Sequence, residues 1–179
     1  GGNWQGPLLG PPYNTSGWAH FVSEAGYRCQ ALGVDHFQIW NEPTRQAGAW
    51  HGTDQQFVDD VYLPAARAIR KLGGKVVFGG WPGSNPLSEF NQLLRHHDAW
   101  RLTDVVDTHY RPVDEWISLM NWTALPDGPT GLWQTEVAPP VPPDRSDQWM
   151  GQPNRLPNKF LRALYWAVSA GRWSSPDQY

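Results

Sequence analysis

Short apolar runs alternate along this chain with longer segments in which apolar residues recur at helical spacing. The runs are rich in Val, Ile, Phe and Trp and predict four strands, at residues 34–40, 75–80, 104–109 and 131–135. The longer segments predict helices at residues 17–32, 54–72, 86–97 and 158–170. Because strands and helices alternate, we expect the α/β class, with a parallel sheet and right-handed crossover connections.

The first predicted helix has a recognisable start and end. Ser16 is a typical N-cap residue, and Gly33 ends the segment. Its apolar residues at helical spacing are Phe21, Ala25, Cys29 and Leu32. This spacing predicts the helix.

The second predicted helix begins at Thr53 and Asp54 and stops at Gly73. Pro64 lies inside it. Because proline has no backbone N–H to donate, we expect it to kink or divide the helix.

Gly, Pro and polar residues mark the remaining segments as loops. They are residues 1–16, residues 113–129 with a helical turn near 116–121, and the Pro-rich residues 138–157. Long loops of this kind are often functional. One further strand is expected to begin at Arg172 and Trp173.

The overall composition fits one domain and excludes several classes of partner. A chain of 179 residues can bury a sizeable core, so we expect a single domain over residues 1–179. The formal net charge is −3 and basic residues are scattered, which excludes the electrostatic footprint of a nucleic-acid or anionic-membrane partner. The sequence contains no apolar run long enough to cross a bilayer. Cys29 is the only cysteine, so an internal disulfide is excluded and the redox compartment is left open.

Tryptophan is unusually frequent, with 12 residues in 179. Large aromatic side chains dominate protein cores, so most of these residues are expected simply to pack. An indole face can also cover the apolar C–H face of a sugar ring. Trp81, which directly follows a predicted strand, is the leading candidate for that role, and the loop residues Trp116, Trp122 and Trp149 are further candidates.

Two glutamates each close a predicted strand. Glu42 follows the first strand and Glu136 follows the fourth, 94 residues later. This separation accommodates about three strand–helix units of roughly 30 residues each. Because α/β barrels gather their chemistry at the carboxyl ends of their strands, we expect the two carboxylates to converge on a common pocket. Either glutamate taken alone could instead be a solvated loop carboxylate.

Three motifs, in this order and at this spacing, resemble glycoside hydrolase clan A, the retaining glycosidases built on a (β/α)₈ barrel. Residues 40–43 (Trp-Asn-Glu-Pro) resemble the clan's Asn-Glu-Pro motif. Residues 108–112 (Thr-His-Tyr-Arg-Pro) are similar to its strand-six segment, and residues 133–136 (Trp-Gln-Thr-Glu) to its strand-seven nucleophile segment. The likeness covers about residues 18–170. The strand-six segment leans towards the family that holds β-xylosidases and related exo-acting hydrolases.

The resemblance implies a role for each residue at these strand ends. Glu42 would be the general acid/base and Glu136 the nucleophile. Asn41 would hydrogen-bond the sugar 2-hydroxyl, His109 would bind substrate or position the acid, and Tyr110 would donate its hydroxyl to Glu136. Adjacent strand residues face opposite sides, so one of His109 and Tyr110 could point outward, and we favour His109. The resemblance implies neither a metal nor an organic cofactor.

The chain departs from the family pattern in several ways. Arg111 stands where several relatives carry a second tyrosine, which leaves open which residue supports the nucleophile. The family's strand-two arginine has no counterpart, and Trp173 is only a distant candidate for its strand-eight tryptophan. A full barrel takes about 250 residues, but only 41 precede Glu42. We therefore expect an incomplete TIM-barrel fold spanning about strands four to seven, either a partial chain or a half-barrel that completes itself by self-association.

These expectations lead to one main hypothesis and two rivals. The main hypothesis is a retaining glycoside hydrolase that cleaves a β-linked glycoside or oligosaccharide by double displacement, with carbohydrate as its partner and no nucleic acid or membrane. The first rival is a catalytically inactive carbohydrate-binding fragment of a barrel. The second is an assembly module that does not recognise carbohydrate.

Overall fold

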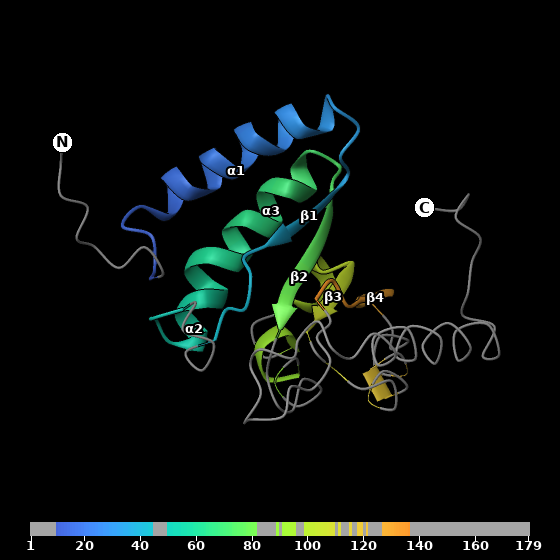
Figure 1. The fold of residues 1–179 in the computed structure, drawn as a ribbon. Helices are drawn as coiled ribbons and strands as arrows, with labels where there is room; N and C mark the ends of the chain where they lie inside the picture. The colour runs from blue at the N-terminus through green and yellow to red at the C-terminus, as the bar shows by residue number, and fades with distance from the viewer. Residues whose placement is uncertain are drawn as a thin grey trace, which may run out of the picture.

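The computed structural model describes residues 10–44, 50–81, 89, 91–95, 99–109, 111, 115, 118–119, 121 and 127–136. In this part of the chain the fold is α/β, with a parallel sheet in the strand order β1-β2-β3-β4 (Figure 1). The strands are β1 (His36–Ile39), β2 (Lys75–Trp81), β3 (Val105–Thr108) and β4 (Gly131–Trp133). The α/β class and the parallel sheet predicted from the sequence are confirmed.

Helix α1 (Thr15–Gln30) begins two residues earlier than predicted. Its N-cap is Asn14 rather than Ser16, and the Asn14 side chain accepts a hydrogen bond of 2.9 Å from the backbone N–H of Gly17. Gly33 follows the helix with a φ of 87°, a left-handed conformation that glycine adopts without steric cost.

The apolar stripe expected for α1 packs only in part, with Ala25 and Cys29 partly buried. Phe21 is 61% exposed and Leu32 is 84% exposed. Instead the Trp18 indole donates a hydrogen bond of 2.9 Å to the carbonyl of Val61, and Gly26 permits close approach, since a Cβ there would lie 2.9 Å from Leu72 Cδ1. A partly buried hydrogen bond and a glycine contact are not visible in a hydrophobicity pattern.

The second helical segment consists of three consecutive pieces, α2 (Asp54–Gln56), the π-helical η1 (Phe57–Tyr62) and α3 (Leu63–Lys71). Thr53 caps its start in a capping box with Gln56. Pro64 lies in the first turn of α3, directly after the wide π-helical turns. Pro64 was expected to kink or divide this helix, and the segment changes from π-helical to α-helical turns directly before it, since a residue without an N–H cannot continue the same pattern of hydrogen bonds.

Shorter elements complete the described residues. The predicted helix at residues 86–97 is described only in part, as the π-helical turn η2 (Asn91–Arg95), and η3 (Trp100–Leu102) is a 3₁₀ turn before β3. The predicted turn near 116–121 lies largely outside the described residues. The loop at 138–157, the helix at 158–170 and the strand at 172–173 lie entirely outside them. Within the described part of the chain, no helix is both long enough and apolar enough to cross a membrane.

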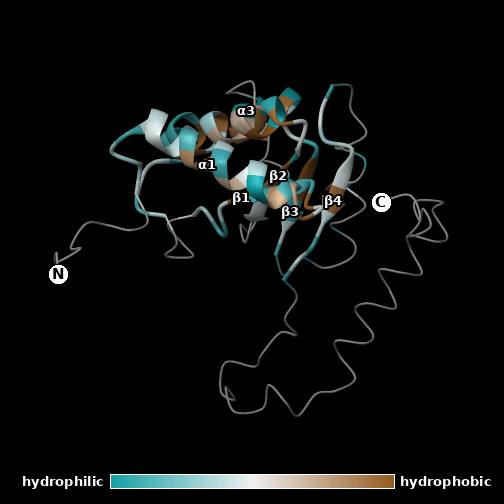
Figure 2. Ribbon diagram, turned by 90° about the horizontal axis from the view of Figure 1, so that it is seen from above, coloured by the Kyte–Doolittle hydropathy of each residue, from teal (hydrophilic) through white to brown (hydrophobic). Residues whose placement is uncertain are grey.

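The sheet packs its helices against one face. Residues Ile39, Phe78, Val106 and Leu132 form one rung of the sheet and belong to, or pack against, the hydrophobic core. Helix α3 packs against β1 and β2, and α1 lies alongside α3 (Figures 1 and 2). Hydrophobic residues appear in brown along α3 and the strands in Figure 2.

The opposite face of the sheet is concave. The rings of His36 on β1 and Trp133 on β4 have centroids only 5.2 Å apart, although two strands lie between them. Neighbouring strands are spaced by about 4.8 Å, so a flat sheet would hold these two backbones roughly 14 Å apart. The sheet must therefore curve so that β1 and β4 approach each other on this face.

Several tryptophans are part of an aromatic core. Trp50 meets Phe57 edge to face at 5.5 Å, Tyr62 meets Phe78 at 5.0 Å, and Phe78 stacks on Trp81 at 5.6 Å. These arrangements are favourable for aromatic rings beyond the burial of apolar area. For Trp50 and Trp81 the structure supports the packing interpretation of the tryptophan content.

Candidate active site

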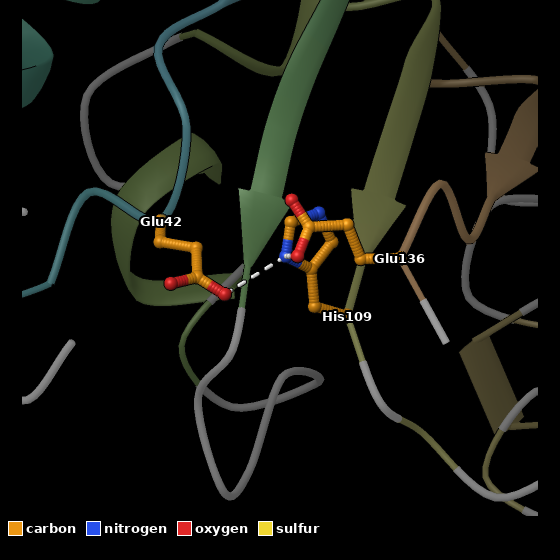
Figure 3. A group of neighbouring side chains, drawn as sticks. All are labelled: Glu42, His109 and Glu136. Carbon is orange, nitrogen blue, oxygen red and sulfur yellow. Dashed lines mark hydrogen bonds and ion pairs between the residues drawn. The ribbon is translucent and has the colours of Figure 1, made fainter. Parts of the chain in front are cut away.

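The carboxyl ends of three strands bring together Glu42, His109 and Glu136 (Figure 3). Nδ1 of the His109 ring lies 3.0 Å from Glu42 Oε1 and 3.7 Å from Glu136 Oε2. One nitrogen of His109 and one carboxylate oxygen from each glutamate all lie within 4.8 Å of one another. The carboxylates of Glu42 and Glu136 are therefore close together. The prediction that the two carboxylates converge, made from strand-end positions 94 residues apart, is confirmed as geometry.

The backbone that presents Glu42 adopts an uncommon conformation. Trp40 has a φ of 70° and Glu42 a φ of 50°, both in the left-handed region that residues with a β-carbon rarely occupy. Such conformations cost about 1–3 kcal/mol each and cluster at functional sites. Packing holds the Trp40 conformation in place, because the Trp40 ring meets the buried Trp50 ring edge to face at 5.6 Å.

Gly80, at the end of β2, allows this segment to approach His109. It has a φ of 64°, and a Cβ there would lie 2.5 Å from Asn41 Oδ1, 3.0 Å from the Glu42 backbone nitrogen and 3.1 Å from His109 Cε1. The three distances mean that no other residue fits without moving the site.

A fully buried aspartate lies beneath the site. Asp107 on β3 accepts hydrogen bonds from the backbone N–H of Gly80 at 3.2 Å, from the backbone N–H of Thr135 at 2.9 Å and from the Thr135 hydroxyl at 2.6 Å. These donors belong to β2 and to the segment that follows β4, so the carboxylate joins the ends of three neighbouring strands. Its burial is compatible with a charge because each oxygen is hydrogen-bonded.

The two glutamates differ in solvent exposure. The side chain of Glu42 is 20% exposed and that of Glu136 is 44% exposed, while His109 between them is fully buried. Among the described residues, the acidic groups that face His109 are Glu42, Glu136 and Asp107. The buried imidazole is thus surrounded by carboxylates.

Carboxylate oxygens and an imidazole nitrogen are also ligands that a divalent cation accepts. Here His109 Nδ1 is already hydrogen-bonded to Glu42, and a cation would have to break that bond. We therefore interpret the three side chains as a hydrogen-bonded group.

Of the other predicted site residues, Asn41 lies at the site, Trp81 lies in the core, and the rest lie outside the described residues. Asn41 is exposed and lies against Gly80 at the edge of the site. Trp81 is 3% exposed, and its indole donates to Glu89, so its ring is enclosed by the core instead of facing the site. Tyr110 lies outside the described residues, as do the loop tryptophans Trp116, Trp122 and Trp149.

Arg111, the residue that departs from the family pattern, supports the backbone of the site. Its Nε donates to the carbonyl of His109 at 3.1 Å, its backbone N–H donates to Gln134 Oε1 at 2.8 Å, and its guanidinium lies 3.5 Å from the Glu115 carboxylate. Arg111 therefore connects the segment after β3 to the segment after β4.

Sequence reasoning did not identify Gly80, Asp107 or Thr135. One signal was present: Asp107 is an acidic residue that follows two valines within a predicted strand, two positions before His109 and so on the same face. Comparison of the chain with models of protein families, with curated proteins and with solved structures finds no match.

Proposed function

We propose that this chain carries the catalytic centre of a retaining glycoside hydrolase that acts on β-linked glycosides or oligosaccharides. The observation that supports it most is the approach of Glu42 and Glu136 to within 4.8 Å from the ends of β1 and β4. Retaining glycosidases hold their carboxyl groups about 5–5.5 Å apart, whereas inverting enzymes need about 6.5–9.5 Å to admit a water molecule. The observed separation favours double displacement.

In this mechanism the two glutamates have different tasks. Glu136 attacks the anomeric carbon and forms a covalent glycosyl intermediate, while Glu42 protonates the departing oxygen. Glu42 then removes a proton from the water that hydrolyses the intermediate. The unequal exposure supports this assignment, because the nucleophile must be charged and Glu136 is the more solvated of the two.

We propose further that the described sheet is an arc of a (β/α)₈ barrel. The contact between His36 and Trp133 supports this through its offset along the strands. His36 lies three residues before Ile39, and Trp133 lies one residue after Leu132 on the same rung, so the two rings are four residues out of step. An eight-stranded barrel of shear eight shifts by about one residue per strand, or about three over three steps. Only every second residue of a strand faces inward, so two inward-facing side chains can be offset by two or four residues but not by three. The observed offset of four residues is therefore one of the two values closest to that of the barrel.

The proposal is tested with a panel of activated aryl β-glycosides. We expect hydrolysis with retention of configuration, and Glu136→Ala should reduce kcat by about three orders of magnitude or more, because the nucleophile is removed. Azide should restore turnover of that variant by occupying the vacated space and forming a glycosyl azide. Glu24→Ala, which changes an exposed glutamate of α1, is the matched control and should retain activity.

The rival functions predict different results in the same assays. A catalytically inactive carbohydrate-binding fragment would change its tryptophan fluorescence with oligosaccharide but would release no aryl group. An assembly module would give neither signal. Hydrolysis that persists in Glu136→Ala without azide would also contradict the proposal.

A further inference from the structure

The hydroxyl of Thr135 determines the direction of a hydrogen-bonded chain below the candidate acid. This hydroxyl lies 2.6 Å from Asp107 Oδ2 and 3.2 Å from His109 Nε2. A hydroxyl has one proton to donate. The Asp107 carboxylate can only accept, so the proton of Thr135 goes to Asp107 and the hydroxyl oxygen is left to accept from His109.

This direction fixes a proton on one nitrogen of His109. Nε2 must carry a hydrogen to donate to Thr135. The second ring nitrogen, Nδ1, lies 3.0 Å from Glu42 Oε1. If the ring is neutral, Nδ1 accepts the proton of a protonated Glu42, and if the ring is charged, Nδ1 donates to Glu42. In either form the Nδ1 side of the ring is committed to Glu42.

Asp107 acts on the same chain without contacting the pocket. It is fully buried, and its other two hydrogen bonds come from backbone N–H groups of Gly80 and Thr135. The carboxylate is therefore held in one orientation. Among the residues that the structure describes, the remaining charged group near Nδ1 is Glu136 at 3.7 Å, and Arg111 donates to the carbonyl of His109.

We infer that Asp107 and Thr135 are positioning residues that hold a proton of His109 on Nε2, and so leave a single proton to be shared between His109 Nδ1 and Glu42. Its kinetic consequence rests on the proposed glycosidase function, because it concerns the acid/base step. Its structural consequence, the placement of the imidazole proton, does not depend on catalysis.

The sharpest variant is Asp107→Asn. An amide whose N–H group takes the place of Oδ2 gives up the hydrogen bond from Gly80 and donates to the Thr135 hydroxyl, which is then free to donate to His109 Nε2. We expect the imidazole proton to move to Nδ1, as measured by two-bond ¹H–¹⁵N correlation spectra of the histidine rings. The wild-type chain should give a signal with Nε2 protonated, which His109→Gln assigns by its disappearance. A His109 signal that is the same in wild type and Asp107→Asn would overturn the inference.

Thr135 provides a second pair of variants in case Asp107→Asn does not fold. Thr135→Val removes the acceptor, whereas Thr135→Ser keeps the hydroxyl and should restore the wild-type spectrum. In aryl glycoside hydrolysis, Asp107→Asn and Thr135→Val should lower kcat by about tenfold to a hundredfold, the equivalent of one hydrogen bond to a charged group, with KM changed by less than about threefold. The pH at which kcat/KM is maximal should also move.

Controls separate this inference from the proposed function. Thr130→Val changes an exposed threonine directly before β4 and should leave both the spectrum and the pH profile unchanged. A wild-type chain that hydrolyses no glycoside would refute the proposed function, while the spectra would still decide the proton placement. Active Asp107→Asn and Thr135→Val chains with wild-type kcat and pH profile would refute the kinetic role of the two positioning residues.

Discussion

At the scale of single residues, the site depends on what glycine allows and on what buried side chains require. Gly80 combines a left-handed φ with contacts to both Asn41 and His109, so the site has no room for a larger residue there. Gly73 has a similar φ of 77°, but nothing lies within 4 Å of the Cβ it would carry. Replacing Gly73 by alanine introduces backbone strain alone, whereas replacing Gly80 by alanine introduces both backbone strain and steric crowding.

Gly80→Ala should therefore destabilise the protein by more than Gly73→Ala. We expect about 1 kcal/mol for Gly73→Ala from backbone strain alone and about 2–4 kcal/mol for Gly80→Ala, because one of the crowded atoms is the Glu42 backbone nitrogen, which cannot rotate away. Denaturant unfolding measures both values. Equal losses of unfolding free energy in the two variants would contradict the close contact between Gly80 and the Glu42 backbone.

The residues of the site differ in how far the sequence predicts them. Glu42, His109 and Glu136 are predicted because each lies at a strand end within a recognisable motif. Asp107, Thr135 and Gly80 are not, because their roles arise from strand register. An irregularity in the pairing of β2 with β3 after Phe78 places Gly80 opposite Asp107. No local pattern in the sequence encodes that displacement.

At the scale of elements, buried apolar strands were the most predictable feature and helix faces the least. The strand β2 reads as a continuous apolar run because both of its faces are covered. Helix α1 was predicted with nearly correct ends, but its packed face was set by Trp18 and Gly26 through contacts with Val61 and Leu72. Such contacts depend on the partner helix, which sequence periodicity does not describe.

One buried hydrogen bond joins the helical segment to the turn before β3. The hydroxyl of Thr103 donates to the carbonyl of Ala99 at 2.9 Å, so Tyr62 must donate its own proton to Thr103, at 2.6 Å. Tyr62→Phe should reduce the free energy of unfolding by about 1 kcal/mol at neutral pH. Tyr27→Phe, which changes an exposed tyrosine of α1, is the control and should have an effect within about 0.5 kcal/mol.

The same residue gives the stability a dependence on alkaline pH. Burial raises the pKa of Tyr62 well above its ordinary value, since its charged form would lose hydration. Its contribution is fully present below the unfolded pKa of about 10 and is lost as pH rises above that value, by up to about 1.4 kcal/mol per pH unit. Unfolding measured between pH 9 and 11.5 should therefore show a shallower decline for Tyr62→Phe. Parallel curves would contradict this account.

At the scale of the whole molecule, the described sheet is an arc whose outer strands are β1 and β4. Its concave face carries His36 and Trp133 in contact, and the carboxylates of Glu42 and Glu136 meet at one end of the same arc. Curvature is thus the property that links fold and site, because a flat sheet would keep the two glutamates apart. The sequence predicts that the strands are parallel, but the bending follows from how the strands stagger.

Exposed apolar side chains directly precede β1, an outer strand of the described sheet. Leu32 and Val34 lie in the segment that leads from α1 into β1, and both are exposed. Parallel sheets are normally covered on both faces, and an unpaired edge is a template for another strand. Self-association is one of the two alternatives for the incomplete barrel, the other being a partial chain, and it is best tested at this edge.

Sedimentation velocity between about 1 and 100 μM should show a mass that rises with concentration, as mass action requires of reversible association. Val34→Lys should shift the protein towards monomer, because a charge directly before β1 opposes pairing of this edge with another edge. Tyr27→Lys adds the same charge at another exposed position, on α1, and should leave association unchanged. A wild-type chain that remains monomeric over the whole range would contradict self-association and would leave the paired carboxylates to act within a single copy.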